Sequence, residues 1–255
     1  MAKSAGYPDY LFVSGYDISG DVGAVRRVAT LRPSLEVTGI NTAGGRERLQ
    51  GLSDGAIAFD AFFNDAASQE HEVLKARAAI EYLMYCMGGT LGNPAAMLVA
   101  LQTSYDGNRG QDGSLLLTVE ALSKGAIGAS PVNQALEWGT QITAGKITHA
   151  SATSSTGEVT ASSASGYAAQ LQVFSVGSGS PIITIEHSSD TTNGIDGVWA
   201  TLEAFAASAA NTAERIEGTG TVNKGLRVTS STVFTNCVFA VALRRGTAVD
   251  TIAYA

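Results

Sequence analysis

The chain has 255 residues, of which 45% are hydrophobic and 15% charged, with a formal net charge of -7, a sequence pI near 4.9 and a mean hydropathy of +0.11. This composition excludes a chain that is disordered throughout, and also a bundle of membrane-spanning helices. The acidic balance disfavours a nucleic-acid-binding domain, because such a domain neutralises phosphates with Lys and Arg.

Short strands separated by turn residues are predicted in the N-terminal half, because apolar and polar residues alternate there. These strands are LEVTGI (35–40), GAIAFDAFF (55–63), AMLVALQT (96–103) and SLLLTVEAL (114–122). Between the second and third, apolar residues at steps of three and four predict one amphipathic helix over 69–87. Ser68 suits the cap before this helix, and Gly88 suits its end.

Residues 146–166 are small and polar, which predicts a linker or an exposed loop. Four further strands are predicted after it, namely YAAQLQVFSV (167–176), PIITIEHSS (181–189), LRVTS (226–230) and CVFAVALRR (237–245). The fold class is therefore mainly β with one flanking α-helix. We expect a first domain over 1–145 and a C-terminal β-sandwich over 167–255, which has enough strands for its own core.

Residue patterns typical of catalysis and of metal binding are absent from the sequence. His71, His149 and His187 have no second His, Cys or carboxylate at the spacing of metal ligands or of a catalytic triad. Phosphate-binding loops and the HExxH and GxSxG motifs are also missing. Cys86 and Cys237 lie far apart in apolar contexts, which predicts buried free thiols. We therefore predict no enzymatic activity, no cofactor and no metal.

Segments that direct a protein to or through a membrane are also missing. The N-terminus has no apolar run of signal-peptide length, and no window approaches the roughly 18 apolar residues of a membrane span. We therefore expect synthesis in a cytoplasm and no membrane partner.

Two passages, which together span most of the chain, carry a family resemblance. The first is DISGDVGAVRR from residue 17, then LEVTGINTAGGRERLQGLSDGAIAFDAFFND (35–65) and RGQDGSLLLTVEALS (109–123). The second is IEHSSDTTNGIDGVWATLEAF (185–205), followed by GTGTVNKGLRVTSSTVFTNCVFAVALRRG (218–246). Both resemble the major tail protein, or tail tube protein, of long-tailed, siphovirus-type bacteriophages, especially those that infect actinobacteria.

This resemblance implies a tail-tube β-sandwich or barrel whose subunits join sheet to sheet in a homo-oligomeric ring, hexameric for one tube domain per chain. Stacked rings then form the tail tube of the virion, a conduit for DNA ejection, after synthesis in the bacterial host cytoplasm. The implied partners are further copies of the chain, tape-measure, tail-terminator and baseplate or tip proteins, and passing DNA that is not bound. The C-terminal strands either complete the tube domain or decorate its exterior.

The resemblance also assigns candidate residues for the bore and for contacts between subunits. A negative wall within a Debye length of about 8 Å repels phosphates, so a DNA conduit suits an acidic protein. The lumen-facing candidates are Asp54, Asp60 and Glu120, on or beside predicted strands. In this family a long loop and an N-terminal arm lie between rings, and the candidates there are Arg46, Glu47 and Arg48 in the loop and Tyr7, Tyr10 and Phe12 in the arm.

A second function remains open at this point. The order HSSD, Trp199 and GLRV also resembles discoidin-like, carbohydrate-binding β-sandwiches. This alternative is a binding, decoration or adhesin module in which Trp199 stacks on a glycan, unless that residue is a buried core Trp. The tail-tube hypothesis predicts self-assembly into stacked rings, whereas the binding module predicts a monomer or discrete oligomer with affinity for a ligand.

Overall fold

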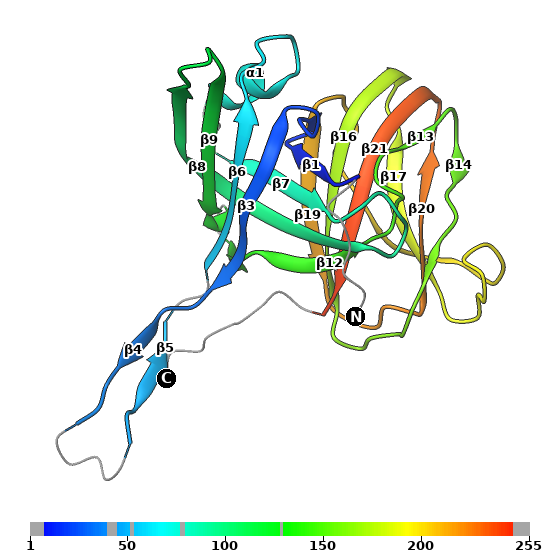
Figure 1. Cartoon of the computed structure of the whole chain (residues 1–255). Helices are drawn as coiled ribbons and strands as arrows, with labels where there is room; N and C mark the ends of the chain where they lie inside the picture. Colours follow the sequence, from blue (N-terminus) through cyan, green and yellow to red (C-terminus); the bar gives the residue numbers. More distant parts are fainter. Residues whose placement is uncertain (1–7, 40–44, 52–53, 77–79, 128–129, 247–255) are drawn as a thin grey trace.

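The computed structural model describes residues 8–39, 45–51, 54–76, 80–127 and 130–246. These residues form a mainly β molecule with one short helix, which confirms the predicted fold class (Figure 1). The described strands form a 12-stranded sheet, a 5-stranded sheet and two 2-stranded sheets.

Three of the four strands predicted in the N-terminal half are present. The fourth, LEVTGI (35–40), is wrong over most of its length, because the observed strand is Ser34–Glu36 and residues 37–39 are not in a strand. The elements of this half are β1 (Tyr10–Val13), β2 (Tyr16–Asp17), β3 (Val22–Leu31), β4 (Ser34–Glu36), β5 (Arg48–Gln50), β6 (Asp54–Phe62), α1 (Glu70–Leu74), β7 (Glu81–Cys86), β8 (Pro94–Arg109), β9 (Leu115–Ser123), β10 (Gly125–Ile127), β11 (Ser130–Gln134) and β12 (Glu137–Gln141).

The predicted helix over 69–87 is wrong over most of its length. Helix α1 ends at Leu74, and the later residues Glu81–Cys86 form β7, which pairs with β1 on one side and β8 on the other. Leu83 and Met84 are both buried although they point to opposite faces, because β7 is covered on both sides. A short apolar run that is buried all round has no period that separates a strand from a helix.

The four strands predicted after residue 166 are also present, and residues 146–166 connect the two sheets of the C-terminal sandwich. Within that segment β13 pairs with β21, whereas β14 and β15 pair with β20. The elements are β13 (Ile147–His149), β14 (Thr153–Ser154), β15 (Glu158–Val159), β16 (Tyr167–Gly179), β17 (Ile182–Ser188), β18 (Ala200–Ala204), β19 (Thr212–Gly218), β20 (Gly225–Ser231) and β21 (Phe234–Arg245).

Strand β8 is the branch point of the large sheet. Its first half pairs with β7 and β12, and its second half pairs with β9, with a bulge between Gln102 and Ser104. A bulge bends a strand and increases its local twist. Because of this branch, β3, β6, β9 and the second half of β8 stand as a four-stranded sheet beside the rest of the molecule (Figure 1).

Three groups of buried side chains hold these layers together. The first includes Phe239 and Val228 and fills the sandwich between β16–β21 and the 5-stranded sheet. The second includes Phe59 and Leu98 and lies between the four-stranded sheet and β1–β7–β8. The third includes Phe12, which meets Phe174 edge to face at 4.7 Å. The large sheet therefore continues from β8 and β12 of the N-terminal half into β21 and β16 of the C-terminal half.

Candidate assembly surface

The four-stranded sheet has two long edges. Strand β3 pairs with β6 alone, and residues 101–109 of β8 pair with β9 alone, within the described part of the chain. The opposite side of each strand therefore presents backbone N–H and C=O groups with no partner among the residues described. Such an edge is a template for pairing with another strand.

One face of this sheet carries charged side chains that pair with one another. Arg26 Nε lies 3.0 Å from the Asp60 carboxylate, and Arg27 Nη1 lies 3.5 Å from the Glu120 carboxylate. Thr118 donates its hydroxyl to Asp60 at 2.8 Å. A shallow hollow of about 450 Å³ lies between these side chains. The face therefore carries both signs of charge, with each of these two arginines held by a carboxylate.

The structure brings together two of the three acidic lumen candidates. Asp60 on β6 is opposite Thr118 on β9, and Glu120 is opposite Ala58, so both carboxylates point to the same face of one sheet. Asp54 begins β6, where its carboxylate accepts the N–H of Gly55 at 2.7 Å. Whether this face lines a bore stays a prediction.

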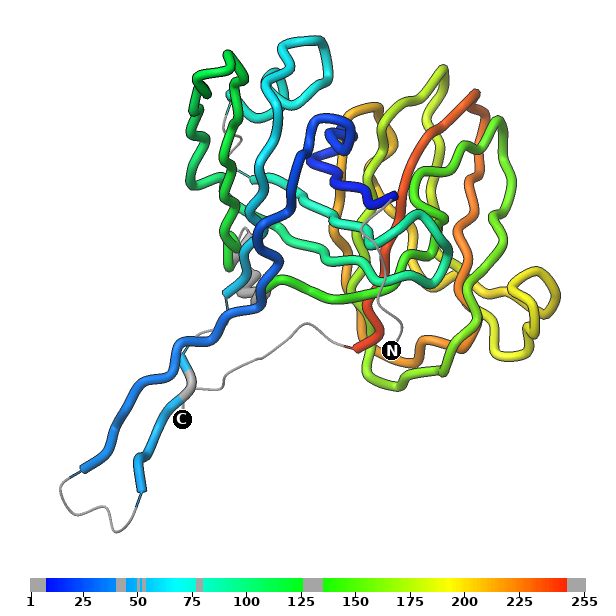
Figure 2. The backbone as a smooth tube through the Cα atoms, viewed as in Figure 1, coloured from blue at the N-terminus to red at the C-terminus, as the bar shows by residue number. Residues whose placement is uncertain are grey.

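A two-stranded hairpin extends the chain far from the body of the molecule (Figure 2). It is formed by β4 and β5, and residues 40–44 at its tip lie outside the described residues. Leu35 and Leu49 are opposite each other and each is 57% exposed, an unusual cost for leucines in water. The hairpin therefore offers apolar surface that another molecule can cover.

The three charged loop candidates all lie on this hairpin and are exposed. Arg46 Nη1 is 3.5 Å from the Glu36 carboxylate, so its ion pair is made within the hairpin. Arg48 is opposite Glu36 in the register. The Glu47 carbonyl accepts the Val37 N–H, and the Glu47 N–H donates to the Thr38 hydroxyl, both at 3.0 Å. A role for Arg46, Glu47 and Arg48 between rings stays a prediction.

The predicted N-terminal arm needs a correction. Tyr7 lies outside the described residues, but Phe12 is 0% exposed in β1 and belongs to the subunit's own core. Tyr10 is half-buried and stacks on Phe12 with ring centroids 5.6 Å apart. Phe12 therefore cannot order on a neighbouring subunit, because its own chain already removes this apolar side chain from water.

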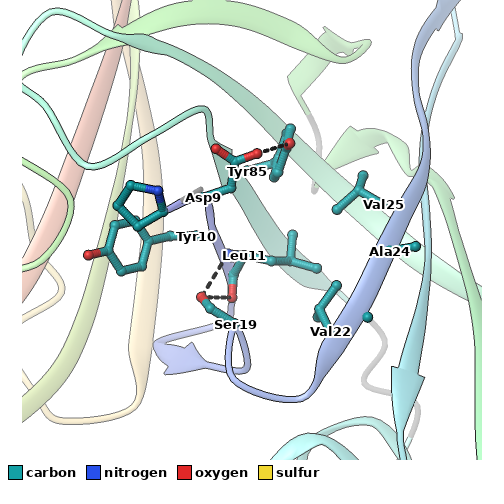
Figure 3. Close-up of a pocket in the computed structure, with 10 residues that line it drawn as sticks. Asp9, Tyr10, Leu11, Ser19, Val22, Ala24, Val25 and Tyr85 are labelled. Atoms are coloured by element: carbon teal, nitrogen blue, oxygen red, sulfur yellow. Dashed lines mark hydrogen bonds between the residues drawn. The ribbon is translucent and has the colours of Figure 1, made fainter. Parts of the chain in front are cut away.

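A pocket of about 520 Å³ lies beside the first part of β3 (Figure 3). Its polar wall is Asp9, whose carboxylate accepts the Tyr85 hydroxyl at 2.6 Å and the Gly88 N–H at 2.7 Å. Its apolar wall includes Leu11 and Val25. The pocket thus adjoins the open side of β3, where an incoming strand has apolar side chains to contact.

Trp199, the glycan-stacking candidate, is packed within its own loop. The guanidinium of Arg227 lies over its ring at 4.3 Å, and the indole N–H donates to the Asp196 carbonyl at 3.0 Å. Arg227 is itself held by Glu186 at 2.7 Å. One face of this ring is therefore already covered by protein.

No set of three or more metal-ligating residues occurs among the residues described. Of the histidines, His71 contacts the Tyr105 hydroxyl at 2.7 Å and His149 contacts the Ser230 hydroxyl at 2.6 Å. Cys86 and Cys237 are free and buried, as predicted, and burial raises the pKa of both thiols. Among the described helices, α1 with its five residues is far too short to span a bilayer.

Sequence reasoning missed the polar side chains that lock the two halves together. Arg215 on β19 makes two hydrogen bonds to the Glu137 carboxylate on β12, at 2.8 and 2.9 Å, and both side chains are buried. Gln172 donates to the Tyr82 carbonyl at 2.9 Å and accepts the Gly15 N–H at 2.6 Å. These partners are separated by 78 to 157 residues, so no local pattern reveals them.

Comparisons with known proteins give structural similarities only, since no family model and no curated protein matches the sequence. The chain is similar to a protein in the tail of an empty gene transfer agent particle with C6 symmetry, at 18% identity and TM-score 0.34, over 43% of this chain and 82% of that one. It is similar to a protein of the native gene transfer agent virion, at 17% identity and TM-score 0.37, over 50% and 94%.

A third similarity is to the SPP1 Dit protein, described as a paradigm of the hub adsorption apparatus in phages infecting Gram-positive hosts. The two chains are 9% identical with a TM-score of 0.33, over 92% of this chain and 99% of that one. We base the proposal below on the residues of this chain.

Proposed function

We propose that this protein is a structural subunit of a phage tail, which closes into rings by pairing β3 of one subunit with β8 of the next. The observation that carries this proposal is the four-stranded sheet with an open strand at each side. Two different edges on one subunit make a head-to-tail contact, and such a contact generates a ring when the rotation closes. Closure removes both exposed edges of this sheet, because each is paired by a neighbour.

In this arrangement the paired charges of the sheet face the bore. Arg26 and Arg27 are each within 3.5 Å of a carboxylate, so a passing phosphate meets no free cation on this face among the residues described. Binding of DNA scales with the phosphates that a protein neutralises. The ring then conducts DNA without holding it, and six subunits per ring is the symmetry we expect.

The exposed hairpin suits stacking of one ring on the next. Leu35 and Leu49 lie far from the body of their own subunit, and their burial on a neighbouring ring removes apolar surface from water. Tape-measure, terminator and baseplate or tip proteins are the further partners that such a tube requires, and the virion tail is its location.

A lysine on the edge tests ring closure. Lysines on edge strands are a common protection against pairing, so Ala24→Lys in β3, at an exposed position, is expected to leave the protein monomeric. The matched control is Thr201→Lys, also exposed, on the β18 edge of the other sheet. Size-exclusion chromatography and negative-stain microscopy should show rings or tubes for the wild type and for the control. Assembly of Ala24→Lys at wild-type concentration, with an unchanged circular dichroism spectrum, contradicts the proposal.

A further inference from the structure

We infer that a hollow at one end of the C-terminal sandwich binds a single neutral sugar ring, with Trp138 as its stacking surface. The hollow has a volume of about 290 Å³ and receives side chains from β8, β12, β15 and β21. This volume is at the lower end of the range typical of small-molecule sites, which fits one ring rather than a longer chain.

Trp138 is the exposed tryptophan of the two in the sequence, and it lines this hollow. Its side chain is 44% exposed, on a strand that lies between two neighbours in the large sheet. In the described part of the chain its indole N–H makes no hydrogen bond, and its ring contacts no other aromatic ring and no cation. Trp199 differs, because the Arg227 guanidinium covers one face of its ring and its indole N–H donates to a loop carbonyl. Trp138 therefore has both a free face and a free donor.

Polar groups surround the indole at the depth of the hollow. Glu158 on β15 is 7% exposed and accepts the Thr140 hydroxyl at 3.1 Å. Thr160, two residues further on, is exposed and lines the same hollow. Arg245 donates to the carbonyls of Asn223 and Lys224 at 2.5 and 3.1 Å, which holds its guanidinium in place.

The polar groups that a ligand can meet in this hollow are hydroxyls and one carboxylate, contributed by Thr140, Thr160 and Glu158. Arg245 Nε and Arg244 Nη1 make no hydrogen bond to any residue described, but both atoms are buried within the protein, so the ligand does not contact them. A donor for Glu158, an acceptor for the Thr160 hydroxyl and an apolar face for Trp138 are combined in the hydroxyls and C–H faces of a sugar.

The charges of the hollow balance, which favours an uncharged ligand. Arg244 lies 3.7 Å from the Glu137 carboxylate, and Arg245 interacts with the Glu158 carboxylate. An anionic ligand is therefore repelled by the carboxylate, and a cationic ligand is repelled by the guanidinium groups. This site does not depend on ring assembly, so it goes beyond the proposed function.

Fluorescence titration tests the site directly. In Trp199→Phe, Trp138 is the sole tryptophan, because the chain contains two. We expect a saturable change in its emission with at least one of the methyl glycosides of glucose, galactose, mannose and N-acetylglucosamine, with a millimolar Kd. No saturable change with any of the four overturns the inference.

Substitutions locate the binding. In the Trp199→Phe protein, Glu158→Gln and Thr160→Val should each raise the Kd of the glycoside by about tenfold. Thr201→Val on β18 should leave the Kd unchanged. Nuclear magnetic resonance of the glycoside should detect binding to the wild type and none to Trp138→Ala, whose circular dichroism spectrum reports its fold. If Trp138→Ala binds the glycoside as tightly as the wild type does, the inference is overturned, whether or not the variant still assembles.

Discussion

The four-stranded sheet and the C-terminal sandwich differ in how their edges are protected. The edge strands of the sandwich and of the far end of the large sheet are shorter than ten residues: β14 and β2 have two residues each, β18 has five and β19 has seven. By contrast, β3 has ten residues, and its two arginines are engaged by carboxylates of its own sheet.

This difference indicates which region assembles. Natural proteins protect exposed edges with short strands, among other devices, and a long open edge promotes association. The sandwich therefore has the edges of a module that stays apart from its neighbours, whereas the four-stranded sheet has those of a subunit that pairs. Strand β8 joins the two regions, because its second half belongs to the four-stranded sheet and its first half pairs with β12, which pairs with β21 of the sandwich. The buried Arg215–Glu137 ion pair ties β19 to β12 beside this connection.

The largest expected effect comes from breaking the buried ion pair between β12 and β19, beside the strand that connects the two regions. Glu137→Ala leaves Arg215 buried without its main partner, and loss of one member of a buried ion pair costs about 3–5 kcal/mol of unfolding free energy. Arg46→Ala is the matched control, because its ion pair on the hairpin is exposed and worth at most about 1 kcal/mol. Urea unfolding of both variants measures the two costs, and equal values contradict the assignment.

A second effect concerns pH and the helix at the end of the four-stranded sheet. Glu70 is 0% exposed, and burial raises its pKa to about 7, although the nearby Tyr105 hydroxyl acts in the opposite direction. Asp21 accepts the Glu70 N–H at 3.1 Å, and its carboxylate raises the pKa further. Between pH 4.5 and 7 the folded chain thus binds more protons than the unfolded chain, so stability falls as pH rises through this window.

Glu70→Gln removes the carboxyl group that titrates. The unfolding free energy of this variant minus that of the wild type should therefore increase by about 2–3 kcal/mol from pH 5 to pH 8. Glu72→Gln, on the exposed side of the same helix, should change little over that range. Thermal or urea unfolding at the two pH values measures both variants, and a wild type with no loss of stability up to pH 8 is evidence that Glu70 is not buried.

A third prediction concerns DNA and the face of the four-stranded sheet. Asp60→Asn combined with Glu120→Gln leaves Arg26 and Arg27 without their carboxylates. The assembled variant should then bind double-stranded DNA with an affinity that falls as salt increases, whereas the wild type should not bind. Glu203→Gln on β18 is the control. Fluorescence anisotropy with labelled DNA measures the effect, and equal affinities place this face outside the bore.

The smallest effect on stability is expected at the hairpin. Leu35→Ser and Leu49→Ser should change the unfolding free energy of the monomer by no more than about 0.5 kcal/mol, because both side chains are exposed. The same variants should nevertheless yield shorter tubes, since stacking loses apolar contact. Tube lengths in negative-stain images, compared with those of Val233→Ser on the sandwich, give the readout. Unchanged lengths indicate that the hairpin does not join rings.

Alternation in the sequence predicted β6, β9 and part of β8. The edge strand β3 was not predicted, because two bulges interrupt its alternation. The sequence placed Asp60 and Glu120 on or beside predicted strands, but that they share one face follows only from the pairing of β6 with β9. The expected helix failed at β7, where both faces are covered. Phe12 was assigned to an N-terminal arm because no local sequence pattern indicates that its strand pairs with β7 or that its ring packs against Phe174. The joint of Arg215 with Glu137 is a contact across 78 residues, which neither period nor spacing encodes.

Electron cryomicroscopy of the purified wild-type chain at high concentration tests the central claim most directly. We predict closed rings, stacked into tubes, in which β3 of each subunit hydrogen-bonds with residues 101–109 of its neighbour and the face with Asp60 and Glu120 lines the bore. Rings built through the sandwich, with β3 left unpaired, would contradict it. So would a chain that remains monomeric at every concentration.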